Sequence, residues 1–506
     1  MLSEKRLFIT TPIFYLNNKP HLGHAYTMII VDIIARYKKS RGYIVSIQTG
    51  SDEHGEKMIK TAEKEELKPL ELIEKNLFFF QKLLKKINFS QHFFYRTTSK
   101  QHQTQTKEIF KKLLEQEDIY LGKYQGKYCT ICEEYVTKGD LQYCLVCKNT
   151  LGILEETAYF FQVTKYYSWL KTYYQKFTNF IIPEKLKKSL INNFLSIETK
   201  DLCLTRSNLT WGIYLDNNPE LTIYVWFDAL LNYLNSSEGQ RSFKDRKVEI
   251  IQIIGKDIAR FHCIYWPIIL YRLNFRLPDK IIAHGWILNQ GIKMSKSKKN
   301  VIDPLFIIER YPSDLLRAYL ISKITFLEDG SFSEEEMKNF YQTFFINDLG
   351  NLVARIGRMV WLYNDGITPC ADSCNYQNNI LLENYSCLLK KKVSQFFKLM
   401  DNQQLTEAFN LIELLVTSSN KLVNDIAPWK TIILDKALVF SFLRQIIGGI
   451  RLITLFLDSF TPEFSSRISD FFSFSKKITI DWENCLKLDS VEGLSISKFS
   501  VLFNPL

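Results

Sequence analysis

The sequence predicts an α/β protein: a doubly wound parallel sheet, interrupted by an inserted domain and followed by an α-helical bundle. Three observations support this. The N-terminal segment alternates a short apolar strand, a helical pattern and a second strand. Cysteine pairs and aromatic segments break this alternation between about 121 and 222. Beyond about 347 the chain consists of long amphipathic segments with few turn signals, which is typical of a helical bundle.

The strands and helix of the first segment follow in order. "RLFIT" (6–10) is a strand, 21–42 is a helical pattern that ends in basic residues and a glycine, and 43–50 is the next strand. In such a sheet the ligand crevice lies at the carboxyl ends of the strands. We therefore expect the loops that carry Ile13, Tyr15, Asp52 and His54 to form the site. After the insertion, strands buried on both faces are expected in "LTIYVWFDAL", "VEIIQIIGKD" and "KIIAHGWIL".

The composition is that of a water-soluble globular protein of about three domains. Of 506 residues, 46% are hydrophobic and 24% are charged. The net charge of +11 favours an anionic partner but fits many functions. No targeting peptide is evident at the N-terminus, so a cytoplasmic location is expected. The apolar segment 437–460 contains Arg444, Arg451 and Asp458, which predicts a buried bundle helix rather than a membrane span.

Two short motifs are suited to binding phosphate. His21 and His24 flank Gly23 in the first turn of a predicted helix, whose N-terminus attracts anions. About 270 residues downstream, "GIKMSKSKKN" (291–300) carries several lysines. Each motif alone is weak, because most lysine runs are solvated surface and a tetrapeptide can occur by chance. Their combination across one interrupted α/β sheet is much harder to explain by chance.

This pair resembles the HIGH and KMSKS signatures of class I aminoacyl-tRNA synthetases. The resemblance implies a Rossmann-type catalytic domain in which His21, His24, Lys293 and Lys296 stabilise the triphosphate of ATP during the reaction. We interpret Lys298 and Lys299 as solvent-exposed residues that follow the motif. The resemblance also implies that Mg²⁺ accompanies ATP. Its ATP-binding residues are Gly23, His24, Gly255, Asp257 and Lys296, with Asp257 at the ribose.

Further segments narrow the resemblance to the methionyl-tRNA synthetase family. "TTPIFYLNNKPHLGHAYT", "GSDEHG", "YVWFDALLNY", "IIGKDIARFH", "IIAHGW" and "KMSKS" occur in the family's order. The resemblance implies that Asp52 holds the ammonium group of L-methionine. It places Ile13, Tyr15, Trp226, Tyr233 and His284 around the thioether. Aromatic groups suit this polarizable side chain, although any single aromatic here could be an ordinary core residue.

Four cysteines predict a structural zinc site. Cys129 and Cys132, then Cys144 and Cys147, form two C-x2-C pairs separated by eleven residues. Four thiolates at such spacing hold one tetrahedral Zn²⁺ and leave no open position for catalysis. The pattern resembles the single zinc knuckle of the family, from which "CLVCKN" departs, so a knuckle without metal stays an alternative.

The bundle carries a candidate anticodon-binding face. Asn347, Asn351 and Arg355 follow at i+4 steps, which predicts one helical face; an ordinary solvated stripe is the alternative. The resemblance implies that these residues and Trp429 read the CAU anticodon of tRNA(Met), including the initiator tRNA. The tail resembles the family's terminal segment that returns toward the catalytic body. No appended domain follows it, so a monomer is expected.

The resulting hypothesis is a methionine–tRNA ligase that serves translation initiation and elongation. Its expected regions are 1–120 and 223–280 (catalytic halves), 121–222 (insertion), 281–345 (lysine loop and stem contact), 346–490 (anticodon bundle) and 491–506 (tail). Three alternatives remain open: a small-molecule nucleotidyltransferase, an inactive RNA-binding protein, and a leucine, isoleucine, valine or cysteine enzyme of the same class. Most of the last group is disfavoured because no editing-sized insertion is present.

Overall fold

The chain forms two compact units. A computed structural model describes residues 4–129, 134–136, 142–144, 148–195, 201–207, 209–294, 300–371, 379–475, 486–498 and 502–506. The first, or α/β, unit contains residues 1–31, 44–85 and 90–286. The second, or helical, unit contains residues 32–43, 86–89 and 287–506.

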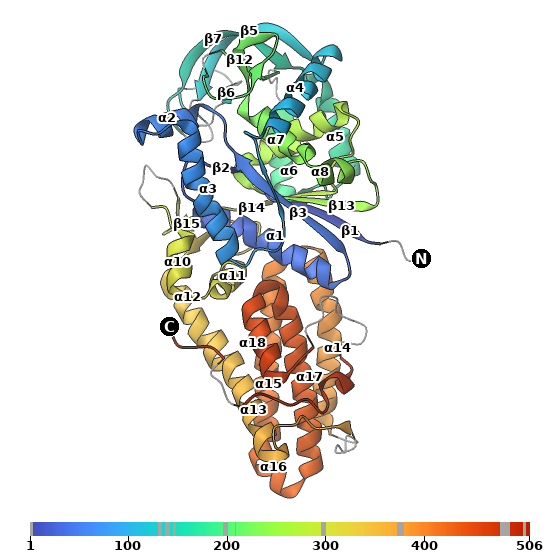
Figure 1. The fold of residues 1–506 in the computed structure, drawn as a ribbon. Coiled ribbons are helices and arrows are strands. Elements are labelled where there is room, and N and C mark those ends of the chain that lie inside the picture. Colours follow the sequence, from blue (N-terminus) through green and yellow to red (C-terminus); the bar gives the residue numbers. More distant parts are fainter. Residues whose placement is uncertain are drawn as a thin grey trace. The chain divides into compact units, whose positions relative to one another are not determined.

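A parallel sheet forms the centre of the α/β unit (Figure 1). Among the described residues, its strands are β1 (Arg6–Thr10), β2 (Phe14–Tyr15), β3 (Ile44–Asp52), β4 (Phe93–Arg96), β8 (Ile181–Ile182), β13 (Val248–Gly255) and β14 (Lys280–His284). They pair in the order β2-β3-β1-β13-β14-β8, and β4 also pairs with β3. The predicted strand-helix-strand unit is confirmed, because α1 (Leu22–Ser40) precedes β3, which lies parallel to β1.

One of the three strands predicted after the insertion is wrong. "VEIIQIIGKD" and "KIIAHGWIL" contain β13 and β14 as expected. In "LTIYVWFDAL", however, the strand β12 (Asn218–Ile223) ends early and pairs antiparallel in a small separate sheet with β10 (Thr205–Arg206) and β11 (Tyr214–Leu215). The rest is the helix α7 (Val225–Asn235), in which every residue except Trp226 is buried. The sequence of a helix that is buried on all sides can lack the period of an amphipathic helix, so it resembles the sequence of a buried strand.

Other helices of this unit surround the sheet. They are α2 (Glu56–Lys64), α3 (Pro69–Lys86), α4 (Lys100–Glu115), α5 (Tyr167–Lys176), α6 (Glu184–Leu190), α8 (Ser237–Ser242) and α9 (Trp266–Arg272). The inserted region begins with a long antiparallel pair, β5 (Ile119–Cys129) and β7 (Gly152–Phe161), which is drawn at the top of the α/β unit in Figure 1. The short strands β6 (Glu134–Val136) and β9 (Leu202–Cys203) flank this pair.

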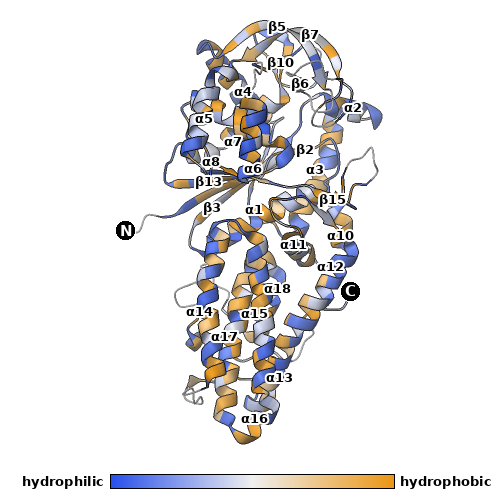
Figure 2. Cartoon of the chain, turned by 180° about the vertical axis from the view of Figure 1, so that it is seen from behind, coloured by the Kyte–Doolittle hydropathy of each residue, from blue (hydrophilic) through white to orange (hydrophobic). Residues whose placement is uncertain are grey.

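The helical unit confirms the predicted bundle. Its helices are α10 (Pro304–Arg310), α11 (Ser313–Ser322), α12 (Glu334–Phe340), the π-helical segment η5 (Tyr341–Gly350), α13 (Asn351–Asn364), α14 (Ile380–Asp401), α15 (Leu405–Ile426), α16 (Pro428–Leu434), α17 (Lys436–Phe460) and α18 (Pro462–Phe472). Hydrophobic and hydrophilic residues form stripes along them (Figure 2). α17 has the length and apolarity of a membrane span, but 78% of its most apolar window is buried within the structure. It is the central helix of the bundle core.

A buried arginine ties several segments of this unit together. Arg317 is fully buried, and its Nη2 lies 2.7 Å from Oδ2 of Asp32. The same guanidinium donates hydrogen bonds to the carbonyl oxygens of Ile87, Ser459 and Phe460. Because guanidinium offers five N–H donors in a fixed plane, one side chain can satisfy acceptors from several segments.

The C-terminal tail packs within the helical unit. The backbone N–H of Thr368 donates to the carbonyl of Leu494, and that of Ser497 donates to the carbonyl of Phe471. Farther on, the ring of Phe503 lies 5.0 Å from that of Phe464. The tail is therefore part of the bundle's own packing.

Candidate active site

The strand order places the candidate site at a topological switch point. β1 and β13 are neighbours at the centre of the sheet, and the chain continues from β1 to β3 on one side and from β13 to β14 on the other. Loops that follow such neighbouring strands diverge and leave a crevice at their carboxyl ends. The loop with His21 and His24 follows β1, and the Gly255–Asp257 segment follows β13. The sequence motifs for ATP thus come from the two strands that define the crevice.

The two histidines of the first motif stack on each other. Their ring centroids are 3.6 Å apart and the ring planes differ by 18°. The backbone N–H of Gly23 donates to Nδ1 of His21, and the backbone N–H of His21 donates to Nδ1 of His24, both at 3.1 Å. Because both Nδ1 atoms accept hydrogen bonds, the neutral rings carry their protons on Nε2. Each ring therefore offers one Nε2–H donor to an anion.

Gly23 is needed where it stands for a steric reason. A Cβ atom at this position would lie 3.0 Å from two atoms of the His21 ring. Any other residue would push this ring away from the stack. The sequence motif therefore has a packing requirement in addition to its chemistry.

His284 lies beside this helix. Its Nε2 is 2.7 Å from Oγ1 of Thr27, and Thr27 in turn donates to the carbonyl of Gly23. Burial lowers the pKa of His284. In register with His284 on the neighbouring strand is Gly255, where an added Cβ would come within 2.6 Å of the Asp257 carboxylate. His284, Gly255 and Asp257 therefore gather at one edge of the sheet.

An aromatic group around α7 is the best candidate for an apolar pocket. Trp226 stacks on Phe261 with a centroid distance of 3.8 Å and an interplanar angle of 5°. Tyr233 is buried, and its hydroxyl is 2.8 Å from Nε2 of His262. Burial lowers the pKa of His262 to about 4, despite the opposing hydrogen bond to the carbonyl of Ile258, so the ring is neutral at physiological pH.

Sequence reasoning missed His262. The histidine closes the quoted segment "IIGKDIARFH", but only its Gly255–Asp257 part was used. The contact joins residues 29 positions apart on two helical segments, so no local spacing indicates it. Trp266 completes the group, with its ring 5.5 Å from that of Tyr233.

Asp52, Ile13 and Tyr15 lie where β2 meets the end of β3. Tyr15 and Asp52 are in register between the two strands. The Tyr15 hydroxyl accepts a hydrogen bond from the backbone N–H of Met58 at 3.1 Å. Gly50 leaves room for the neighbouring strand and for Ile13, because a Cβ there would lie 2.2 Å from the carbonyl oxygen of Tyr95 and 3.0 Å from the Ile13 side chain. These three predicted residues are thus brought to one end of one strand pair.

The lysine loop belongs to the helical unit. Lys293 ends the short strand β16 (Ile292–Lys293) and is exposed. β16 is joined to β15 (Ile287–Asn289) by Gln290 and Gly291, which have φ of 50° and 75°, the left-handed geometry of a tight hairpin turn. Lys296 lies outside the described residues.

The first cysteine of each pair lies at a hairpin or turn in the inserted region. Cys129 pairs with Glu134 at the end of the β5–β6 hairpin, and Cys144 begins a turn closed by its hydrogen bond to Asn149. Both thiols are buried, whereas Cys132 and Cys147 lie outside the described residues. Two hairpin turns with thiols fit the donor set of a zinc knuckle. Lys148 has a φ of 62°, a conformation that glycine adopts at lower cost.

In the bundle, two of the four predicted anticodon residues come together. The guanidinium of Arg355 lies 5.6 Å from the ring centroid of Trp429 and donates to Oδ1 of Asn424 at 3.1 Å. The Trp429 side chain is 43% exposed. Asn347 and Asn351 are also exposed, but Asn347 lies in the π-helical segment, where the i+4 rule for an α-helix does not hold. Asn424 is an additional polar residue at this face.

The fold and the switch-point site define a class I tRNA synthetase. The family described as tRNA synthetases class I (M) matches residues 7–150 and 139–357. A methionine–tRNA ligase of Ureaplasma parvum is 38% identical over 85% of this chain and 84% of its own length. One of Listeria monocytogenes is 36% identical over 97% of this chain and 76% of its own length. The chain belongs to the family of methionine–tRNA ligases.

A solved structure agrees with this assignment over the whole chain. Methionyl-tRNA synthetase of Mycobacterium tuberculosis in complex with methionyl-adenylate is 30% identical, with a TM-score of 0.89 over 99% of both chains. The predicted class I fold is therefore confirmed.

Proposed function

We propose that this protein activates L-methionine with ATP and transfers the methionyl group to tRNA(Met), including the initiator tRNA. The methionine carboxylate attacks the α-phosphorus of ATP, which gives methionyl-adenylate and pyrophosphate. A hydroxyl of the terminal adenosine then takes the acyl group and releases AMP. The strongest support is the family membership together with a site whose two sides carry the donors for phosphate and the aromatic groups for a thioether.

For the first step the chain supplies position and electrostatics. In this proposal the Nε2–H donors of His21 and His24 bind phosphate oxygens at the N-terminus of α1, and Lys293 and Lys296 add positive charge. Mg²⁺ arrives with ATP and neutralises charge on the phosphates. Gly255 lets the chain approach the nucleotide and Asp257 binds the ribose hydroxyls. No protein nucleophile is needed, because alignment and charge stabilisation supply much of the acceleration.

Methionine would be held by its two ends. Asp52 binds the ammonium group, while Ile13, Tyr15, Trp226 and Tyr233 surround the thioether. We add His262 to this set because it fixes the Tyr233 hydroxyl as a neutral partner. His284, whose Nε2 is held by Thr27, is the remaining member of the proposed thioether pocket.

The test is ATP–pyrophosphate exchange with each of the twenty amino acids. We expect methionine alone to stimulate exchange in the wild-type protein. His24→Ala and Lys296→Ala should reduce the rate by about 10² or more, whereas Lys299→Ala should change it little. Exchange with another amino acid would contradict the methionine pocket, and no exchange in a folded protein would refute the activity.

The Arg355–Trp429 face would bind the anticodon. Stacking of one base on an aromatic ring contributes about 1–3 kcal/mol, so Trp429→Ala should lower kcat/KM for tRNA(Met) by about tenfold to a hundredfold. Amino acid activation needs no tRNA, so pyrophosphate exchange by the same variant is the control and should not change. Equal loss in both assays would mean that Trp429 serves folding.

We also propose one structural Zn²⁺ held by Cys129, Cys132, Cys144 and Cys147. Four thiolates would brace the inserted hairpins and leave no open coordination position. Metal analysis should find about one zinc per chain in the wild-type protein and in Cys387→Ser, whose cysteine lies in the bundle, but little in Cys144→Ser. Equal zinc in all three proteins would contradict the site.

The rival functions make different predictions. A small-molecule nucleotidyltransferase would not charge tRNA(Met), and an inactive RNA-binding protein would not exchange pyrophosphate. A monomer in the cytoplasm stays a prediction, which sedimentation and fractionation would test.

A further inference from the structure

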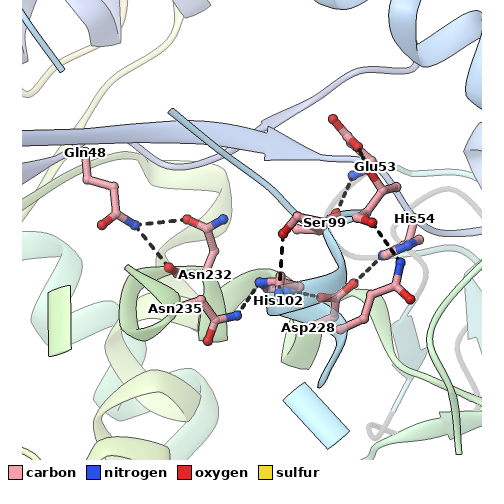
Figure 3. A network of polar contacts seen from close by, with 11 residues as sticks. Gln48, Glu53, His54, Ser99, His102, Asp228, Asn232 and Asn235 are labelled. Atoms are coloured by element: carbon pink, nitrogen blue, oxygen red, sulfur yellow. Dashed lines mark hydrogen bonds and ion pairs between the residues drawn. The ribbon is translucent and has the colours of Figure 1, made fainter. Parts of the chain in front are cut away.

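A buried carboxylate joins the start of α7 to the turn that follows Asp52. Asp228 is 1% exposed and lies between two imidazoles, with its Oδ2 2.7 Å from Nδ1 of His54 and its Oδ1 hydrogen-bonded to Nε2 of His102 (Figure 3). Burial alone would raise the pKa of Asp228, but the two histidines outweigh it and lower the pKa to about 2. The carboxylate is therefore ionised under all physiological conditions.

The second imidazole is fixed from its other side. The side-chain amide of Asn235, at the end of α7, donates to Nδ1 of His102. Since Nδ1 accepts, His102 carries a proton on Nε2, and this proton points at Asp228. Figure 3 shows Asn235, His102, Asp228 and His54 in one continuous row. The row connects the last residue of α7, the first turns of α4 and the end of β3.

The turn that carries His54 is held at every residue. The Glu53 carboxylate accepts hydrogen bonds from Arg96 and Thr98, and its carbonyl accepts one from the indole N–H of Trp211 at 2.6 Å. Gly55 has a φ of 109° and donates its backbone N–H to the carbonyl of Trp211. Because Asp52 directly precedes this turn, the position of the turn determines the direction of the Asp52 side chain.

We propose that His102 and Asp228 are positioning residues that hold the His54 turn, and through it Asp52, in the geometry that binds the amino group of the amino acid substrate. The inference rests on the proposed function, because it uses Asp52 as the ammonium ligand. Neither residue touches substrate in this scheme. A shift of about 1 Å at a binding group can cost about a hundredfold in rate.

Directional bonds distinguish this role from simple packing. A leucine of similar size could fill the space of the His102 imidazole. It would, however, remove one hydrogen-bond donor from the Asp228 carboxylate, and this carboxylate would then hold the His54 ring less firmly. A glutamine at 102 keeps an N–H donor at nearly the same reach. The chain also offers a matched control: Thr106 is one helical turn farther along α4, equally buried, and its hydroxyl has no hydrogen-bond partner among the described residues.

The experiment measures KM and kcat for methionine and for ATP in pyrophosphate exchange. We expect His102→Leu to raise the KM for methionine about tenfold or more, with the KM for ATP unchanged. His102→Gln should restore most of the affinity, and Thr106→Val should match the wild type. If His102→Leu does not fold by circular dichroism, Asp228→Asn tests the same link and should also raise the KM for methionine alone.

A coupling measurement tests the path through Asp52. In an Asp52→Asn background, His102→Leu should add less than about twofold to the KM for methionine, because there the group that it positions is already lost. Independent, multiplicative effects would overturn the proposal, as would equal changes in both KM values, failure of His102→Gln to rescue, or a defect in Thr106→Val. If wild-type protein exchanges pyrophosphate with methionine and the KM for methionine is unchanged in His102→Leu and Asp228→Asn, only this inference fails. If wild-type protein does not, the proposed function fails and this inference with it.

Discussion

Two buried carboxyl groups, Asp228 in the α/β unit and Asp314 in the helical unit, have pKa values shifted in opposite directions. Both are almost fully buried. The pKa of Asp228 falls to about 2, whereas burial raises that of Asp314 to about 6. Desolvation is the largest single cause at each site and raises the pKa at both, so the difference lies in the partners.

The two carboxyl groups differ in whether both oxygens have a hydrogen-bond donor, and in whether the nearby cation binds other acceptors. Asp228 has an imidazole on each oxygen. For Asp314, Oδ2 accepts the backbone N–H of Phe464 at 2.8 Å, and Oδ1 has no hydrogen-bond partner among the described residues. A backbone hydrogen bond of Glu463 also lowers the pKa of Asp314, but the Glu463 carboxylate raises it. The nearby Arg317 lowers the pKa only partly, since its N–H groups are committed to Asp32 and to three carbonyls. Hydrogen-bond donors that point at a buried carboxylate thus lower its pKa below the usual value. A neighbouring cation whose N–H groups bind other acceptors does not offset the desolvation of the carboxylate.

The largest effect is expected at Arg317, whose N–H groups bind Asp32 and three backbone carbonyls. Arg317→Leu removes the donor of three buried carbonyls and one partner of Asp32, so we expect the free energy of unfolding to fall by about 3–5 kcal/mol. Urea unfolding followed by circular dichroism measures it. Arg310→Leu is the control, because Arg310 is 44% exposed in its surface pair with Glu334, and should cost less than about 1 kcal/mol. Similar losses in the two variants would mean that the buried cluster is no stronger than a surface pair.

A smaller effect is expected at Asp228. Its folded pKa lies below the unfolded value, so its ionisation stabilises the fold above about pH 4, and this stabilisation is lost as pH falls toward 2. Asp228→Asn should lower the free energy of unfolding by about 2 kcal/mol at pH 7, with the gap to wild type shrinking below about pH 4. Urea titrations at pH 7 and pH 3.5 measure it. A gap that does not depend on pH would show that packing, rather than charge, stabilises this site.

The smallest effect should have the opposite sign. Because the folded pKa of Asp314 is raised, its ionisation destabilises the fold as pH rises from about 4 through 6. Asp314→Asn keeps an oxygen for Phe464 but also buries an amide NH2 group, which offsets part of the gain of about 3 kcal/mol that the raised pKa implies. We therefore expect a net stabilisation of about 1 kcal/mol at pH 7.5, with no gain near pH 4. Thermal melts at both values measure it. Destabilisation at pH 7.5 would remove the contrast between the two acids.

The sequence predicted the parts of the fold that follow from local pattern. The strand-helix-strand opening, the insertion and the amphipathic bundle each have a period or a break that can be read directly. The start of the buried helix α7 does not, because "LTIYVWFDAL" is mostly β-branched, aromatic and aliphatic, as in a buried strand. The predicted strand therefore included Trp226, which lies on this helix.

The candidate site was predictable where a motif follows a strand. Tyr15 and Asp52 were expected at the carboxyl ends of the strands, and they are the last residues of the neighbouring strands β2 and β3. His262 and the Asp228 row could not be found in this way. They depend on side chains from helices that meet only in the tertiary structure, and no spacing in the sequence encodes such a meeting.

The stacked pair His21 and His24 has a consequence for how the protein responds to salt. Both Nδ1 atoms of this pair already accept backbone hydrogen bonds, so in the proposed function this end of α1 would bind phosphate through oriented N–H dipoles. Dipolar binding in a partly buried site is screened weakly by mobile ions, whereas attraction by exposed lysines such as Lys293 weakens as ionic strength rises. We therefore expect phosphate binding at this end of α1 to persist at high ionic strength, where the long-range attraction of phosphate by the lysine loop is weak.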